Sequence, residues 1–115
     1  MTMHGRRKTP RSLCADLLKI RWKDTSGTSH KEYAELEDIS EGGICLQMES
    51  QIVPGTQIAI LYPRGRYVGV VKYCRLETDG YVMGVQFLPG YRWTRRQFDP
   101  AHLLQFRLKI AERTR

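Results

Sequence analysis

The sequence predicts an all-β fold, a six-stranded antiparallel β-barrel followed by one C-terminal α-helix. Short runs of β-branched and aromatic residues recur along most of the chain, and turn residues separate them. Within the clearest runs, apolar and polar residues alternate, as in half-buried strands. This pattern ends at Pro89 and Gly90, and the later pair Asp99 and Pro100 is typical of a helix start. The 115 residues, 41% of them apolar, suffice for one domain with one core.

The first half of the chain contains three predicted strands. Ser12–Trp22 is the first, and its apolar residues change parity at Leu17 and Leu18, which predicts a bulge that bends the strand. A polar loop leads to the second strand, Lys31–Ile39, whose glutamates indicate a solvated face. A tight turn then leads to the third strand, Ile44–Glu49, which alternates most regularly.

The second half contains three more strands and the helix. The strands are Gln57–Tyr62, Tyr67–Leu76 and Tyr81–Leu88, and glycine-containing turns separate them. The helix is expected over Pro100–Glu112, where basic residues are interspersed among apolar residues as in an amphipathic helix. The chain therefore divides into a basic N-terminal arm (1–11), a barrel (12–90), and a basic connector with the helix (91–115).

The net charge of +7 is concentrated at the two ends of the chain. Residues 1–11 carry +4, residues 12–89 carry −2, and residues 90–115 carry +5. A nucleic-acid-binding barrel more often spreads its bases along a strand face. This distribution favours a basic arm that closes over a compact anion.

Several classes of protein have no signature in this sequence. No stretch approaches the roughly 20 apolar residues that a membrane span needs, and no apolar segment follows the basic N-terminus as in a signal peptide, so we expect a cytoplasmic protein. The cysteines Cys14, Cys45 and Cys74 are widely spaced and are expected to be reduced, without a metal. Motifs for hydrolysis or phosphate transfer are absent from the sequence, so we expect no catalytic residues, no cofactor and no enzyme.

Two short motifs indicate a binding site. The first is Arg-x-x-x-Arg at Arg7 and Arg11, with Arg6 directly before it. The second is Asp-x-Ser-x-x-Gly, formed by Asp38, Ser40 and Gly43, with Gly42 beside it. Arginine suits an anionic nucleotide because its planar fork makes paired hydrogen bonds to phosphate and to the O6/N7 edge of guanine. A carboxylate at Asp38 could accept hydrogen bonds from guanine, Ser40 offers a hydroxyl, and the glycines leave room for close approach or for positive φ.

The two motifs, in this order, resemble those of the PilZ domain family. The segment DISEGGICL over residues 38–46 and the segment YVMGVQF over residues 81–87 resemble the family's typical strands, and the likeness covers about residues 6–88. The resemblance implies a PilZ-type barrel that binds the bacterial second messenger cyclic di-GMP. It also implies that Arg7 and Arg11 clamp the ligand with Arg6 as a third contact. The protein would then signal by conformational change to an effector protein of motility, secretion or polysaccharide synthesis.

Two other functions stay open at this point. The chain could be a PilZ-like adaptor that binds no nucleotide and acts only through protein contacts. It could also be a small basic barrel that binds RNA or single-stranded DNA, although the net charge of −2 in residues 12–89 opposes this. The aromatic residues in the strands are expected in the core or in cross-strand pairs. The cluster at residues 91–96 has no assigned role.

Overall fold

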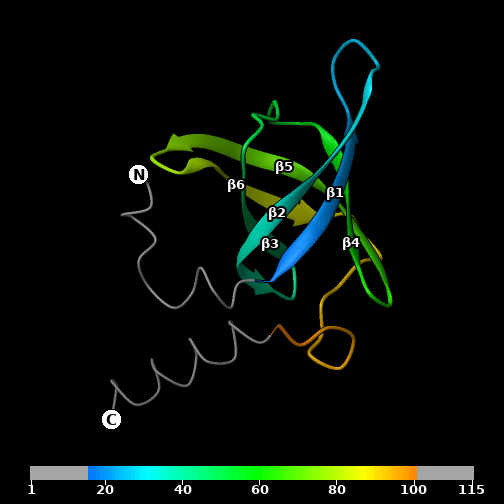
Figure 1. Cartoon of the computed structure of the whole chain (residues 1–115). Helices are drawn as coiled ribbons and strands as arrows, with labels where there is room; N and C mark the ends of the chain where they lie inside the picture. The colour runs from blue at the N-terminus through cyan, green and yellow to red at the C-terminus, as the bar shows by residue number, and fades with distance from the viewer. Residues whose placement is uncertain (1–15, 101–115) are drawn as a thin grey trace.

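The computed structural model describes residues 16–100 of the chain and shows a closed barrel of six antiparallel strands (Figure 1). The predicted arm (1–11) and all but the first residue of the predicted C-terminal helix, Pro100–Glu112, lie outside the described residues. No helix within residues 16–100 is long and apolar enough to cross a membrane. The strands are β1 (Leu17–Lys23), β2 (Ser29–Ser40), β3 (Gly43–Met48), β4 (Gln57–Tyr62), β5 (Gly65–Glu77) and β6 (Gly80–Phe87).

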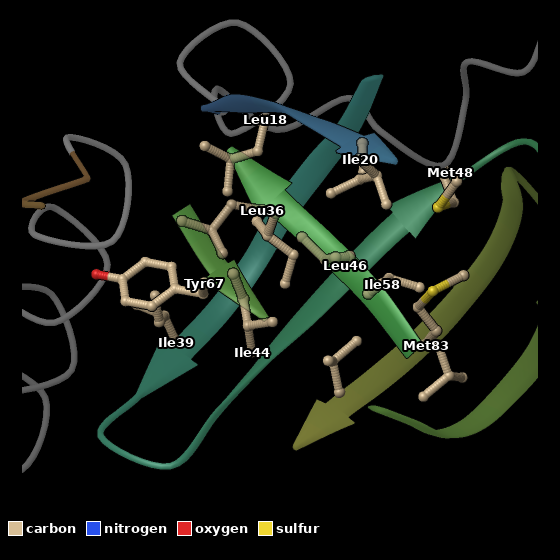
Figure 2. Packing of buried hydrophobic residues seen from close by; sticks show 14 of the residues in the cluster. Leu18, Ile20, Leu36, Ile39, Ile44, Leu46, Met48, Ile58, Tyr67 and Met83 are labelled. Atoms are coloured by element: carbon tan, nitrogen blue, oxygen red, sulfur yellow. The ribbon is translucent and has the colours of Figure 1, made fainter. Parts of the chain in front are cut away.

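The strand order around the barrel is β1-β2-β3-β6-β5-β4, and β4 pairs again with β1. Every adjacent pair is antiparallel, and closure leaves no free edge that could pair with another chain. The core lies inside this ring, where the side chains labelled in Figure 2 meet. Its fully buried residues include Ile20, Leu36, Leu46, Ile60 and Met83.

The structure confirms the six predicted strands and corrects two details. The first strand begins at Leu17 in the described part of the chain, and Leu17 and Leu18 pair with Glu35 and Ala34 without any shift in register. The bulge predicted between them is therefore absent. In β1 the even-numbered residues face the core, so Leu18 is buried while Leu17 is 61% exposed.

The register shifts that bend this barrel lie in β2 and β5 instead. The first falls between Leu36 and Asp38, and the second falls between Val71 and Tyr73. Each inserts one extra residue into its strand, Glu37 or Lys72, which reverses the inward and outward alternation beyond it. These two bulges determine which side chains reach the outer surface at the site described below.

A connector over residues 89–100 follows β6 and closes one end of the barrel (Figure 1). Trp93 is 9% exposed and belongs to the core, and its indole N–H donates a hydrogen bond to the carbonyl of Phe98 at 2.7 Å. Phe98 in turn contacts Tyr62, which stacks on Tyr67 at 4.8 Å between ring centroids. The aromatic residues of this segment are therefore structural, as those of the strands largely are.

Candidate functional site

The Asp-x-Ser-x-x-Gly motif spans the hairpin between β2 and β3. Asp38 and Ser40 are exposed at the end of β2, Gly42 lies in the turn, and Gly43 begins β3. A small hollow of about 150 Å³ is lined by residues 38–40 and 43–45. The structure thus brings Asp38, Ser40, Gly42 and Gly43 together, whereas Arg6, Arg7 and Arg11 lie outside the described residues.

The bulge in β2 turns Asp38 toward solvent. Ala34 and Leu36 are buried, so a strict period of two would also bury Asp38. Because Glu37 is the extra residue, Ile39 takes the inward position and Asp38 faces out. The Asp38 Oδ1 atom accepts a hydrogen bond from the Ile39 N–H at 2.9 Å, and within residues 16–100 its other oxygen has no partner. That oxygen remains available as an acceptor.

The register places Asp38 in a row of outward positions across four strands. Asp38 pairs with Cys45 on β3, Cys45 pairs with Gly84 on β6, and Gly84 pairs with Tyr73 on β5. Adjacent strands are about 4.8 Å apart, so the row extends over roughly 14 Å of the outer surface. A row of this length can contact a small ligand along several residues and not only through one side chain.

Tyr73 forms a flat aromatic surface at the far end of this row. A Cβ atom on Gly84 would lie 2.2 Å from the Cε2 atom of Tyr73, so the ring rests directly on the Gly84 backbone. The hydroxyl of Tyr73 reaches the Cys45 sulfur at 3.9 Å, and the Arg75 guanidinium lies 4.9 Å from the ring centroid. Tyr73 remains 40% exposed. An exposed ring with an arginine beside it can stack on a base and contact a phosphate.

Cys45 contributes a neutral contact rather than a nucleophile. Burial raises the pKa of its thiol, although the hydrogen bond with Tyr73 opposes that shift. A thiol that stays protonated is a poor nucleophile and adds no charge to the surface.

Gly43 is required by packing rather than by a left-handed backbone. The glycines with positive φ in the described chain are Gly27, Gly55, Gly80 and Gly90, so neither Gly42 nor Gly43 uses the positive φ that glycine permits. A Cβ on Gly43 would lie 2.5 Å from the Val85 carbonyl oxygen of β6, whereas a Cβ on Gly42 would meet nothing within 4 Å. Gly42 thus leaves open space above the turn.

The chain enters the barrel beside this site. The Asp16 carbonyl accepts a hydrogen bond from the Leu36 N–H at 2.9 Å, and Leu36 is two residues before Asp38. Figure 1 shows the start of β1 at the same end of the barrel as the β2–β3 turn. Asp16, the first described residue, therefore lies next to the part of β2 that carries the outward-facing carboxylate.

The connector contacts the same turn from the other side. The Trp93 N–H donates to the Glu41 carbonyl at 3.2 Å, and the Phe87 N–H donates to the Gly42 carbonyl at 2.9 Å. Arg92 Nη1 also lies 3.2 Å from Glu41 Oε2. An open hollow of about 660 Å³ lies between the turn and the connector, lined by Glu41, Gly42 and residues 90–92. The cluster at residues 91–96 is thus tied to the motif.

No sequence motif marks the surface residues Tyr73, Arg75 and Cys45. Alternation from the buried residues Tyr67 and Val71 would turn Tyr73 inward, and only the bulge at Lys72 turns it outward.

Groups of three His, Cys, Asp or Glu side chains that could hold a metal are absent from residues 16–100. The surface therefore offers a carboxylate, hydroxyls, an aromatic ring and an arginine for binding a ligand.

Six antiparallel strands close into one barrel, and the hairpin between β2 and β3 contains the Asp-x-Ser-x-x-Gly motif. The model of the PilZ domain family matches residues 5–109, which is most of the chain. The chain therefore belongs to the PilZ family, whose members generally bind cyclic di-GMP and are typically non-catalytic receptor domains. Comparison with curated proteins and with solved structures gave no match.

Proposed function

We propose that this protein binds cyclic di-GMP on the outer row of β2, β3, β6 and β5, and that the basic arm closes over the ligand. The observation that carries the proposal is the row itself, in which the bulges turn Asp38 and Tyr73 outward at either end. The free Asp38 oxygen can accept hydrogen bonds from the N–H groups of a guanine edge, which adenine does not offer in the same arrangement. Ser40 adds a hydroxyl, and Gly42 and Gly43 keep the turn free of side chains.

The arm supplies the positive charge that the two phosphates require. Arg11 precedes Asp16 by five residues and Arg7 precedes it by nine, so the extended chain could span about 17 Å and about 30 Å. Both lengths cover the roughly 14 Å row. Arg7 and Arg11 then clamp phosphate or the guanine O6/N7 edge, and Arg6 is a third contact.

The signal passes to a partner through the β2–β3 turn. Once the arm is ordered over the turn, the hydrogen bonds from Trp93 and Phe87 to the turn carbonyls transmit any shift to the connector. The turn and the connector then contact a partner protein, and the family resemblance points to machinery of motility, secretion or polysaccharide synthesis. Because the messenger is intracellular, we also propose that the protein is located in the cytoplasm.

Isothermal titration with cyclic di-GMP, with cyclic di-AMP as the control ligand, tests the proposal. Arg7→Ala and Arg11→Ala should each weaken binding by about 1.5–3 kcal/mol, as expected for charge-assisted hydrogen bonds, with unchanged thermal unfolding. Lys31→Ala is the matched control, because it removes a base from the other end of β2, seven residues before Asp38 and opposite Arg21 of β1.

Each contrary outcome points to a different function. If a folded chain gives no heat with either nucleotide, the protein is an adaptor that works by protein contacts alone. If it binds RNA with a steep salt dependence and cyclic di-GMP only weakly, it is a nucleic-acid-binding barrel. Full-strength binding by the Arg7→Ala, Arg11→Ala double variant would overturn the clamp.

A further inference from the structure

A second surface hollow lies on the side of the barrel away from the proposed nucleotide site. It measures about 680 Å³ and lies over the outer faces of β1 and β4 and the start of β5. Ala59, Leu61 and Val68 form its apolar floor, since Ala59 pairs with Val68 and Leu61 pairs with Arg66 across β4 and β5. We call this surface, with the bases described next, the basic groove.

The basic groove gathers most of the positive charge of the barrel. In β1 the alternation sends Lys19, Arg21 and Lys23 to the outer face, while Lys31 on β2 and Arg66 on β5 flank them. These five are most of the eight bases in residues 12–89, a segment whose net charge is −2. Within residues 16–100 none of the five forms an ion pair with a carboxylate.

Two features show that acidic side chains of the described barrel do not neutralise the bases of the groove. Arg21 lies directly opposite Lys31 in the antiparallel register, a like-charge pair that destabilises a sheet. Asp24 is an acidic residue in the lining of the groove, but its carboxylate already forms hydrogen bonds within the β1–β2 hairpin. It accepts hydrogen bonds from the Ser26 and Thr28 N–H groups at 2.9 Å and lies 2.7 Å from His30 Nε2.

We infer that the basic groove docks an acidic segment of a partner protein, in which carboxylates flank an apolar side chain. The carboxylates would meet Arg21, Lys23 and Arg66, and the apolar side chain would cover the floor. The chain's own termini do not fit, because residues 1–15 carry +4 and residues 101–115 carry +3. The lining also contains Trp22, which stacks on His30 at 5.2 Å, but Trp22 is only 9% exposed. The aliphatic floor therefore favours a peptide over single-stranded nucleic acid, which stacks on a series of exposed aromatic rings. A concave surface is also poorly shaped for a flat membrane.

An amide-shift titration of the ¹⁵N-labelled full chain tests this inference. The probe is a synthetic peptide that alternates glutamate with leucine, and the control peptide has glutamine in place of glutamate. We expect the acidic peptide to shift amides of β1 and β4, including Arg21 and Ala59, with an affinity that falls as salt rises. No shift at the groove, or equal shifts with the glutamine peptide, would overturn the inference. So would tighter binding there of an oligothymidine or of phosphatidylglycerol vesicles.

Charge reversal within the groove provides the second arm of the test. The Arg21→Glu, Arg66→Glu variant should bind the acidic peptide at least about tenfold more weakly, whereas the Lys72→Glu, Arg96→Glu variant, an equal charge change outside the groove, should keep its affinity. Because Arg21→Glu creates an opposite-charge pair with Lys31, the melting temperature should not fall. Unchanged peptide binding by a folded double variant would overturn the inference. Cyclic di-GMP titration of the same variant separates the two sites, since the groove is independent of the proposed nucleotide row.

Discussion

At the scale of the residue, the aromatic surface depends on the contact between Tyr73 and Gly84. The ring rests on a backbone without a side chain and remains exposed on its outer side. Tyr73→Ala should weaken cyclic di-GMP binding by about 1–3 kcal/mol, the usual contribution of stacking one base on an aromatic ring, with little change in fold stability. Tyr73→Phe is the matched control and should bind nearly as the parent does. Equal loss in both variants would assign the effect to the hydroxyl contact with Cys45.

Gly84 in the row and Gly43 beside the neighbouring turn should respond differently to the same substitution by alanine. In Gly84→Ala the new methyl meets the Tyr73 ring, a side chain that can swing outward, so binding should weaken while the unfolding free energy changes little. In Gly43→Ala the methyl meets the Val85 carbonyl at 2.5 Å, and a backbone cannot move alone. We expect a loss of about 1–3 kcal/mol in unfolding free energy, as for other overpacked positions. Chemical denaturation and nucleotide titration of both variants provide the comparison.

At the scale of the element, the β1–β2 hairpin is held by one carboxylate. Hydrogen bonds from His30, Ser26 and Thr28 hold the pKa of Asp24 well below its ordinary value of 3.8. A carboxyl group whose pKa is lower in the folded state stabilises the fold above its unfolded pKa, and that contribution is lost as the pH falls below 3.8. The unfolding free energy of Asp24→Asn should therefore depend less on pH between about pH 5 and about pH 2. Denaturation at several pH values measures this, and equal slopes would contradict it.

The six strands were predicted from the sequence, whereas neither bulge was, and only the bulge in β2 leaves a signal there. Alternation gave all six strands, because buried residues such as Leu46 and Ile60 recur with a period of two. The break from Leu36 to Ile39 was visible as a change of parity within β2, and it marks the bulge beside Asp38. In β5 no fully buried apolar residue follows the bulge to reveal the change of parity, since Cys74 is only partly buried. Tyr73 and Arg75 therefore could not be assigned to the site, although the motif residues Asp38 and Ser40 could.

At the scale of the whole molecule, the barrel separates two surfaces of different charge. The row from Asp38 to Tyr73 crosses β2, β3, β6 and β5, while the basic groove lies over β1 and β4. Lys19, Arg21 and Lys23 alternate within β1 and share one face by that pattern alone, whereas only the barrel register brings Lys31 of β2 and Arg66 of β5 beside them. A closed barrel can thus hold a nucleotide and a partner protein without competition for the same residues.

The proposed relay predicts where ligand binding should be felt across the molecule. The N–H groups of Phe87 and Trp93 donate to the carbonyls of Gly42 and Glu41, so they exchange with solvent when the turn opens. Cyclic di-GMP, by ordering the turn, should slow exchange at both amides, whereas amides at the β1–β4 pairing should change little. Hydrogen exchange followed by NMR measures each amide. If protection at Asp38–Gly43 rises while Phe87 and Trp93 keep their rates, the nucleotide binds without reaching the connector, and the signal must leave through the arm instead.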